Sequence, residues 1–171
     1  MKINVQILFR RCPVDFSNRY DKVIKKHEDI IKVIDPIWVK NTDNWGAVFP
    51  KKEDVSLLVN MVHHSDLVLN LGSTMAHDFA IYDKPCLYFN YDPLIDKNRS
   101  VTDVYNFQHF KSMKGIAAVG WIKTKKDIGP TVSKALNKPN EVGEERKKWL
   151  KKIVKNPLGN ASSLIAKHLI N

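Results

Sequence analysis

Short apolar runs alternate with longer amphipathic stretches along the whole chain, a pattern typical of α/β domains with a mostly parallel sheet. The apolar runs predict strands at residues 3–9, 32–39, 66–71, 86–90 and 116–119. Helical spacing of apolar residues predicts helices at 19–31, 53–64, 75–82, 127–136, 142–155 and 162–170. Polar stretches at 41–50 and 91–102 predict loops, and Pro36 should break the second strand or confine it to an edge. We therefore predict a three-layer Rossmann-like domain with a helical C-terminal extension.

The composition fits one soluble domain spanning residues 1–171, because 43% of the 171 residues are hydrophobic and 27% are charged. No apolar run approaches the roughly 20 residues of a membrane-spanning helix, and no targeting signal is visible, so we expect a cytoplasmic protein. Cys12 and Cys86 lack the spacing of a metal site or a disulfide framework. We expect two free thiols and no bound metal.

The formal charge of +10 comes entirely from the C-terminal third of the chain. Residues 1–110 contain 14 Lys/Arg and 14 Asp/Glu, whereas residues 111–171 contain 14 and 4. Such a run of lysines can be a solvated helix face, or it can attract an anionic substrate or a membrane surface. No motif of specific nucleic-acid recognition accompanies the charge.

The stretch with the clearest chemical content follows the predicted strand at 66–71, where Gly72, Ser73 and Thr74 lead directly into a predicted helix. Free backbone N–H groups and two hydroxyls at a helix start favour a phosphate. Asp78 lies one helical turn beyond Thr74, where a carboxylate can accept hydrogen bonds from ribose hydroxyls. The alternative interpretation is that the hydroxyls only cap the helix and Asp78 is solvated. Neither a GxGxxG sequence nor a Walker A sequence is present.

This segment resembles the C-terminal nucleotide-sugar-binding domain of the two-Rossmann (GT-B) glycosyltransferases of bacterial surface polysaccharide synthesis. It is also similar to the CDP-glycerol glycerophosphotransferases, and the resemblance covers roughly residues 3 to 138. The matching features are the strand at 66–71, the hydroxyl pair Ser73-Thr74, Asp78, and Lys84-Pro85 before the next strand. The resemblance implies that Gly72, Ser73 and Thr74 bind the diphosphate of the donor and that Asp78 binds its ribose.

A second match lies near the amino end, where these families often have Arg-x-His-Pro and this chain has Arg10-Arg11-Cys12-Pro13. Cys12 replaces the histidine, so no role of that imidazole transfers to this chain. Arg10 is retained, and its planar guanidinium suits the oxygens of a pyrophosphate.

The resemblance implies the donor-binding half of a glycosyltransferase that uses a nucleotide-diphosphate sugar, with UDP as the expected nucleotide, and without a cofactor. In these families the acceptor site belongs to a preceding N-terminal domain, so we expect this chain alone to be inactive without such a domain or a partner subunit. His109 is a candidate catalytic residue. The basic C-terminal helices could then lie at the inner face of a membrane. Two alternatives remain: transfer of glycerophosphate from CDP-glycerol, and a non-catalytic basic module that binds an acidic protein or nucleic acid.

Overall fold

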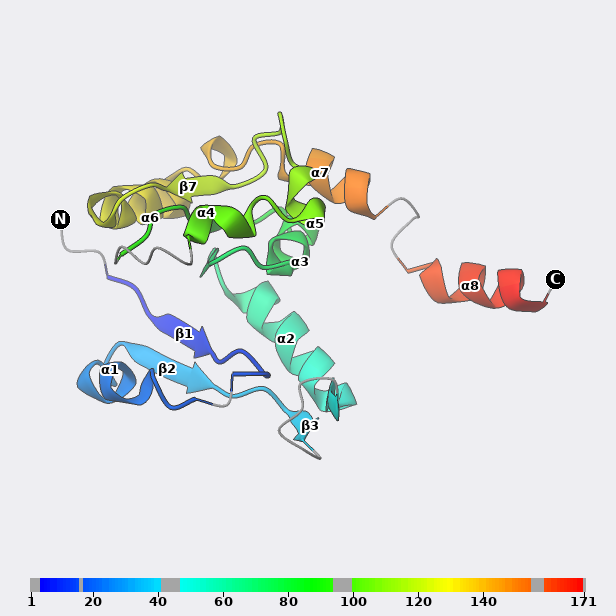
Figure 1. Ribbon diagram of the computed structural model, residues 1–171, viewed down its shortest axis with the longest axis horizontal. Helices are drawn as coiled ribbons and strands as arrows, with labels where there is room; N and C mark the ends of the chain where they lie inside the picture. The colour runs from blue at the N-terminus through cyan, green and yellow to red at the C-terminus, as the bar shows by residue number, and fades with distance from the viewer. Residues whose placement is uncertain (1–3, 16, 41–46, 94–99, 155–158, 171) are drawn as a thin grey trace. The chain divides into compact units, whose positions relative to one another are not determined.

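The computed structural model describes residues 4–15, 17–40, 47–93, 100–154 and 159–170. The chain divides into two compact units, Met1–His64 and Ser65–Asn171 (Figure 1). Each unit is described by itself, and the expectation of one domain over residues 1–171 stays a prediction. Residues 41–46 and 94–99, which belong to the two predicted loops, lie outside the described residues.

Unit 1 contains a parallel strand pair, a short antiparallel pair and two helices. Its elements are β1 (Ile7–Arg10), α1 (Asp21–Lys26), β2 (Ile31–Ile34), β3 (Trp38–Lys40), β4 (Val48–Pro50) and α2 (Lys52–His64). Strand β1 pairs with β2 in parallel, with Ile7 opposite Ile31. Strand β3 pairs with β4 in the antiparallel sense.

The sequence predictions for unit 1 hold for α2 and fail in two other places. The helix predicted at 19–31 ends at Lys26, because the chain turns at His27, whose carbonyl accepts hydrogen bonds from the N–H groups of Ile30 and Ile31. The β-branched residues that follow then favour a strand. Pro36 separates β2 from β3, as predicted, and β4 lies in a stretch that was predicted to be a loop.

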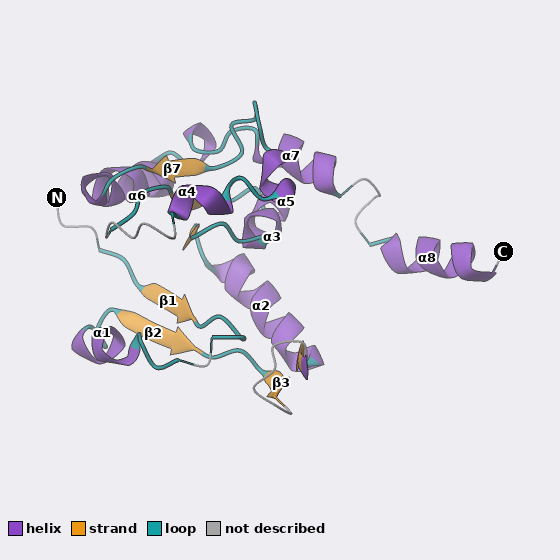
Figure 2. Ribbon diagram, viewed as in Figure 1, coloured by secondary structure: helices purple, strands orange, loops and turns teal. Residues whose placement is uncertain are grey.

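Unit 2 is an α/β unit with a parallel sheet of three strands, which confirms the predicted fold class. The strands are β5 (Val68–Asn70), β6 (Cys86–Phe89) and β7 (Gly120–Ile122), in that order. The helices, which are purple in Figure 2, are α3 (Met75–Ile81), α4 (Val101–Val104), α5 (Gln108–Lys111), α6 (Ile128–Asn137), α7 (Arg146–Ile153) and α8 (Ala161–Ile170). Two single 3₁₀ turns, η2 (Lys125–Asp127) and η3 (Pro139–Glu141), flank α6.

Strand β6 has an apolar cluster on each of its faces. Cys86 and Tyr88 belong to a cluster that includes Ala76 of α3, Phe110 of α5 and Trp149 of α7. Leu87 and Phe89 pack instead in a cluster formed by residues of β7, α6 and the turn before α7. Because successive strand side chains point to opposite faces, β6 is the middle layer of three.

Two predicted elements of unit 2 are displaced along the chain. The strand predicted at 116–119 is β7, four residues later. There Gly120 lies opposite Leu87, and a Cβ at Gly120 would lie 2.5 Å from a Leu87 methyl carbon. The helix predicted at 142–155 begins only at Arg146, because Gly143 has a φ of +62° and lies against the Ala118 carbonyl.

Arg146 connects α7 to the turns around it. The side chain is 4% exposed, and its Nε donates a hydrogen bond to Asp83 Oδ1 at 2.8 Å. Its Nη1 donates to the carbonyls of Pro139, Val142 and Gly143. A buried guanidinium needs most of its donors satisfied, so this arrangement fixes the entry into α7.

Candidate functional site: the carboxyl edge of the parallel sheet

The three strands of unit 2 are parallel, so their carboxyl ends share one edge. Ligands of open α/β sheets bind outside this edge. A polar residue lies beyond each strand end here: Ser73 beyond β5, Asn90 directly after β6, and Lys123 directly after β7. The edge therefore combines hydroxyl, amide and ammonium groups, which can all donate hydrogen bonds to an anion.

Gly72 has a packing role in the loop that follows β5. Its φ is +55°, and a Cβ at this position would lie 2.4 Å from Val104 Cγ1 and 3.3 Å from the Phe110 ring. Only glycine combines this backbone conformation with this contact. The packing accounts for Gly72 without a ligand, and its role in diphosphate binding stays a prediction.

Several backbone groups of the same loop form hydrogen bonds within the protein. The Ser73 N–H donates to Asn70 Oδ1 at 3.2 Å, and the Met75 N–H donates to Ser73 Oγ at 3.2 Å. The Tyr88 hydroxyl donates to the Ser73 carbonyl at 2.5 Å. Since α3 has only seven residues, its N-terminus is also a weak source of positive potential. The N–H groups of Ser73 and Met75 are therefore already used within the protein.

Thr74, the last residue of this loop, faces solvent. It is exposed, and its side chain makes no capping hydrogen bond to α3. The interpretation of Thr74 as a simple cap is therefore wrong, whereas Ser73 does accept the Met75 N–H. The Thr74 hydroxyl is available to an incoming ligand.

Asp78 is a half-buried carboxylate one turn beyond Thr74. Burial raises its pKa above the ordinary value of 3.8, and among the described residues no group forms a hydrogen bond or ion pair with it. A charged group that loses water without gaining a partner destabilises the fold. Such groups are concentrated at functional sites, where a ligand supplies the missing donors.

His77, the neighbour of Asp78, packs against the ring of Trp149. Its ring centroid lies 4.1 Å from that of Trp149, and burial lowers the pKa of its imidazole. Its Nδ1 is buried and has no hydrogen-bond partner among the described residues. The Trp149 indole N–H donates to Ser112 Oγ at 2.7 Å. The contact between the two rings packs α3 against α7.

Arg10, the other predicted diphosphate ligand, lies in unit 1 and is engaged there. Its Nη2 donates to both carboxylate oxygens of Asp54, at 2.9 and 2.8 Å. Asp54 is 3% exposed and also accepts hydrogen bonds from the Ile37 N–H and the Trp38 indole N–H. Burial alone would raise the pKa of Asp54, but these donors together lower it. Arg10 therefore has a structural role, and its contact with a diphosphate stays a prediction.

His109 and the two cysteines are readily placed. His109 is exposed on α5, with its ring 4.0 Å from that of Phe110, and its catalytic role stays a prediction. Cys12 is exposed and Cys86 is buried, and both are free thiols, as predicted.

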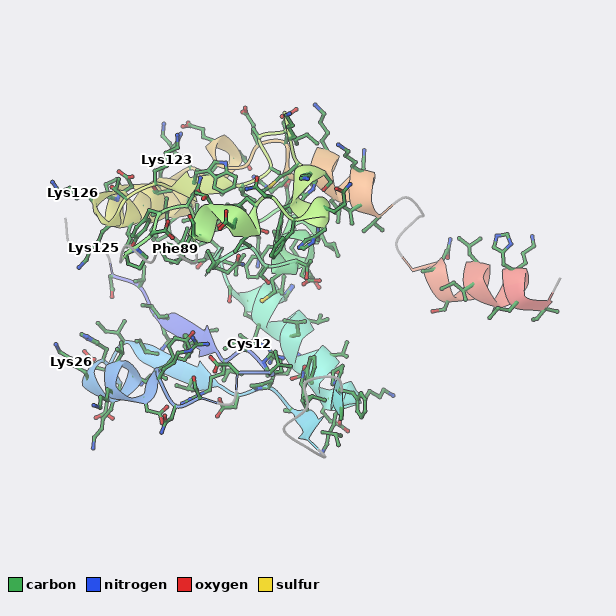
Figure 3. All side chains as sticks on the ribbon, viewed as in Figure 1. Cys12, Lys26, Phe89, Lys123, Lys125 and Lys126 are labelled. Carbon is green, nitrogen blue, oxygen red and sulfur yellow. The ribbon has the colours of Figure 1, made fainter. Side chains whose placement is uncertain are left out.

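Sequence reasoning missed Asn90 and the lysines that follow β7 as site residues. The Asn90 N–H donates to the Ile122 carbonyl at 2.8 Å, and among the described residues its buried Oδ1 has no partner. Lys123, directly after β7, and Lys125 and Lys126 of η2 are exposed (Figure 3). The signal that could have found them is the polar residue beyond each apolar run.

Comparison of the chain with protein-family models, with curated proteins and with solved structures finds no match. Within the described ranges, no three His, Cys, Asp or Glu side chains are close enough together to hold a metal ion. No helix in the described part of the chain has the length and apolar character needed to cross a bilayer.

Proposed function

We propose that unit 2 binds the nucleotide-diphosphate part of a sugar donor at the carboxyl edge of its sheet, as the donor-binding half of a glycosyltransferase. The observation that carries this proposal is Asp78, a half-buried carboxylate with no partner among the described residues. A ribose diol supplies two hydroxyl donors to such a group. The exposed Thr74 hydroxyl, one turn away, suits a phosphate oxygen.

The lysines after β7 support the same assignment through charge. When the glycosidic bond of a donor breaks, the diphosphate leaves with increased negative charge, and fixed cations stabilise that charge. Lys123, Lys125 and Lys126 are exposed at the edge where the strands end. This arrangement supports a donor site, and transfer additionally requires an acceptor-binding part.

The test is calorimetric titration of the purified protein with UDP, CDP, a UDP-sugar and CDP-glycerol. We expect a nucleoside diphosphate to bind, and we expect both Asp78→Asn and Thr74→Val to weaken the binding about tenfold, the loss of one to two hydrogen bonds. The matched control is Asp66→Asn, because Asp66 is exposed and precedes the amino end of β5. Absence of nucleotide binding, or equal weakening by Asp66→Asn, would refute the proposal.

The same titration separates the two donor classes and adds a pH signature. A preference for CDP-glycerol over the UDP ligands would assign glycerophosphate transfer instead. Hydrogen bonds from ribose favour the ionised carboxylate. Binding should therefore weaken as pH falls through the raised pKa of Asp78, and Asp78→Asn should remove this dependence.

A further inference from the structure

Helix α7 has a buried face and a set of exposed lysines. Arg146, Trp149 and Leu150 are buried on one face. The exposed residues include four lysines: Lys147, Lys148, Lys151 and Lys152. By their spacing, Lys147, Lys148 and Lys151 lie about 100° or more from Trp149 around the helix axis, whereas Lys152, three residues beyond Trp149, lies beside it. Helix α7 therefore presents a compact row of positive charge to solvent.

Helix α8 has an apolar stripe that is exposed among the described residues. Ala161, Ile165 and Leu169 recur every four residues and so lie along one face. Ile165 is 61% exposed and Leu169 is 82% exposed, and none of the described residues of α8 is buried. Lys167 lies on the opposite side of the helix by its spacing. A stripe of this kind is costly in water and indicates a surface that becomes covered.

These two faces lie close together in the sequence, within a segment that contains no acidic residue. After Glu145 the chain has seven Lys/Arg and no Asp or Glu. Seven residues separate the end of α7 at Ile153 from the start of α8 at Ala161, and seven extended residues span at most about 25 Å. Both helices can therefore contact the same extended surface.

We propose that α7 and α8 form a docking segment for an anionic lipid membrane surface. The α7 lysines meet the lipid headgroups, and Ile165 and Leu169 enter the boundary between the headgroups and the acyl chains. Cations beside exposed aliphatic side chains are the pattern of interfacial helices. Nucleic acid matches only the lysines, because phosphate binding makes no use of a leucine stripe.

Two acidic groups near the lysine row reduce its charge without cancelling it. Asp83 pairs with Lys147 at 2.6 Å, and Glu145 pairs with Lys148 at 2.7 Å. Lys152 donates to the Ser112 carbonyl at 2.7 Å. Exposed ion pairs of this kind contribute little to stability.

The experiment measures co-sedimentation of the full chain with vesicles, in the absence of nucleotide. Vesicles of phosphatidylcholine are compared with vesicles that contain about 30% phosphatidylglycerol, an anionic lipid. We expect binding to the anionic vesicles, and we expect it to weaken at least tenfold when salt rises to about 0.5 M. Equal binding to both vesicles would overturn the proposal. So would tighter binding of duplex DNA than of the anionic vesicles.

Variants of the two faces make the test specific. Replacing the four α7 lysines by Gln should weaken vesicle binding at least tenfold. The matched control replaces four exposed lysines of unit 1, Lys22, Lys25, Lys26 and Lys32, by Gln and should change binding less than twofold. The double substitution of Ile165 and Leu169 by Ser should also weaken binding about tenfold, whereas Ser163→Ala should not.

These side chains are exposed, so circular dichroism should report an unchanged fold for every variant. The proposal would be contradicted if substitution of the unit 1 lysines weakened vesicle binding as much as substitution of the α7 lysines. It would also be contradicted if substitution of Ile165 and Leu169 left vesicle binding unchanged. The readout is independent of nucleotide binding, so the proposed function and the docking segment can fail separately.

Discussion

The two parallel-strand regions of this chain have similar residues but very different surroundings. In unit 2, Leu87 and Tyr88 of β6 and Ile122 of β7 are fully buried, because apolar clusters cover both faces. In unit 1, Ile7 of β1 is 44% exposed and Leu8 is 36% exposed. Parallel strands are ordinarily covered on both faces. The comparison teaches that the stabilisation that an apolar strand provides depends on what covers its faces.

Truncation of an equivalent side chain in each region should give the largest contrast. Leu87→Ala leaves a cavity under full cover and should lower the free energy of unfolding by about 4 kcal/mol. Leu8→Ala removes a side chain that is partly in water and should cost about 1 kcal/mol. Urea denaturation followed by circular dichroism measures both values. Equal losses would mean that the two strand regions are covered alike.

The stability of unit 1 should depend instead on its buried ion pair between Arg10 and Asp54. Asp54→Ala leaves Arg10 without a counter-charge and should cost about 3 kcal/mol. The control is Asp35→Ala, because Asp35 pairs with Arg11 on the surface and should contribute less than about 0.5 kcal/mol.

The same ion pair gives unit 1 a pH dependence with a defined sign. The pKa of folded Asp54 is lowered, so its stabilisation is present above the ordinary value of 3.8 and is lost as pH falls through the lowered value. Urea denaturation at a series of acidic pH values should show this loss in the parent chain and a shallower one in Asp54→Ala. If the free energy of unfolding falls with pH equally in Asp54→Ala and in the parent chain, Asp54 is not the cause of this pH dependence.

Two glycines with positive φ separate the effect of packing from that of backbone strain. Gly72→Ala places a methyl group against Val104 and should cost about 2 kcal/mol. Gly115→Ala meets no atom within 4 Å and should cost only the left-handed strain of about 1 kcal/mol. Thermal unfolding of both variants gives the difference, which should vanish if the loop after β5 adapts freely.

The smallest expected effect has the opposite sign. Asp78→Asn removes a half-buried charge without a described partner, so it should raise the free energy of unfolding at pH 7 by about 0.5 kcal/mol. Because the pKa of folded Asp78 is raised, the parent chain should recover this difference as pH falls through that pKa. Denaturation at pH 7 and pH 4 checks both statements. Destabilisation by Asp78→Asn at pH 7 would show that the carboxylate is structural.

Sequence patterns predicted the elements whose local and tertiary signals agree. Helix α2 was found because the spacing of its apolar residues is helical, and β6 because its apolar run is buried, whereas β5 was found although none of its residues is buried. Strand β7 was misplaced because the run at 116–119 is as apolar as a strand, although Ala118 and Val119 are buried outside the sheet. The pairing of Gly120 with Leu87 is a tertiary contact, and residue spacing does not encode it.

The sequence predicted the part of the candidate site that depends on local residue order, and not the part that depends on tertiary contacts. The order of strand, hydroxyl pair and acidic residue identified Thr74 and Asp78. The internal use of the loop amides depends on Asn70 and on Tyr88, which is 15 residues away from its acceptor. The ion pair between Arg10 and Asp54 likewise joins residues that are 44 positions apart. Contacts of this range follow from the assembled core.

The acceptors around Arg146 have a consequence for behaviour in acid. Three of them are peptide carbonyls, which bind no proton across the pH range in which the chain stays folded, and only Asp83 titrates. The guanidinium itself remains charged throughout. Protonation of Asp83 therefore weakens one contact of Arg146 and leaves its hydrogen bonds to the carbonyls in place. As pH falls, the start of α7 should stay ordered after the contacts that depend on carboxylates are lost.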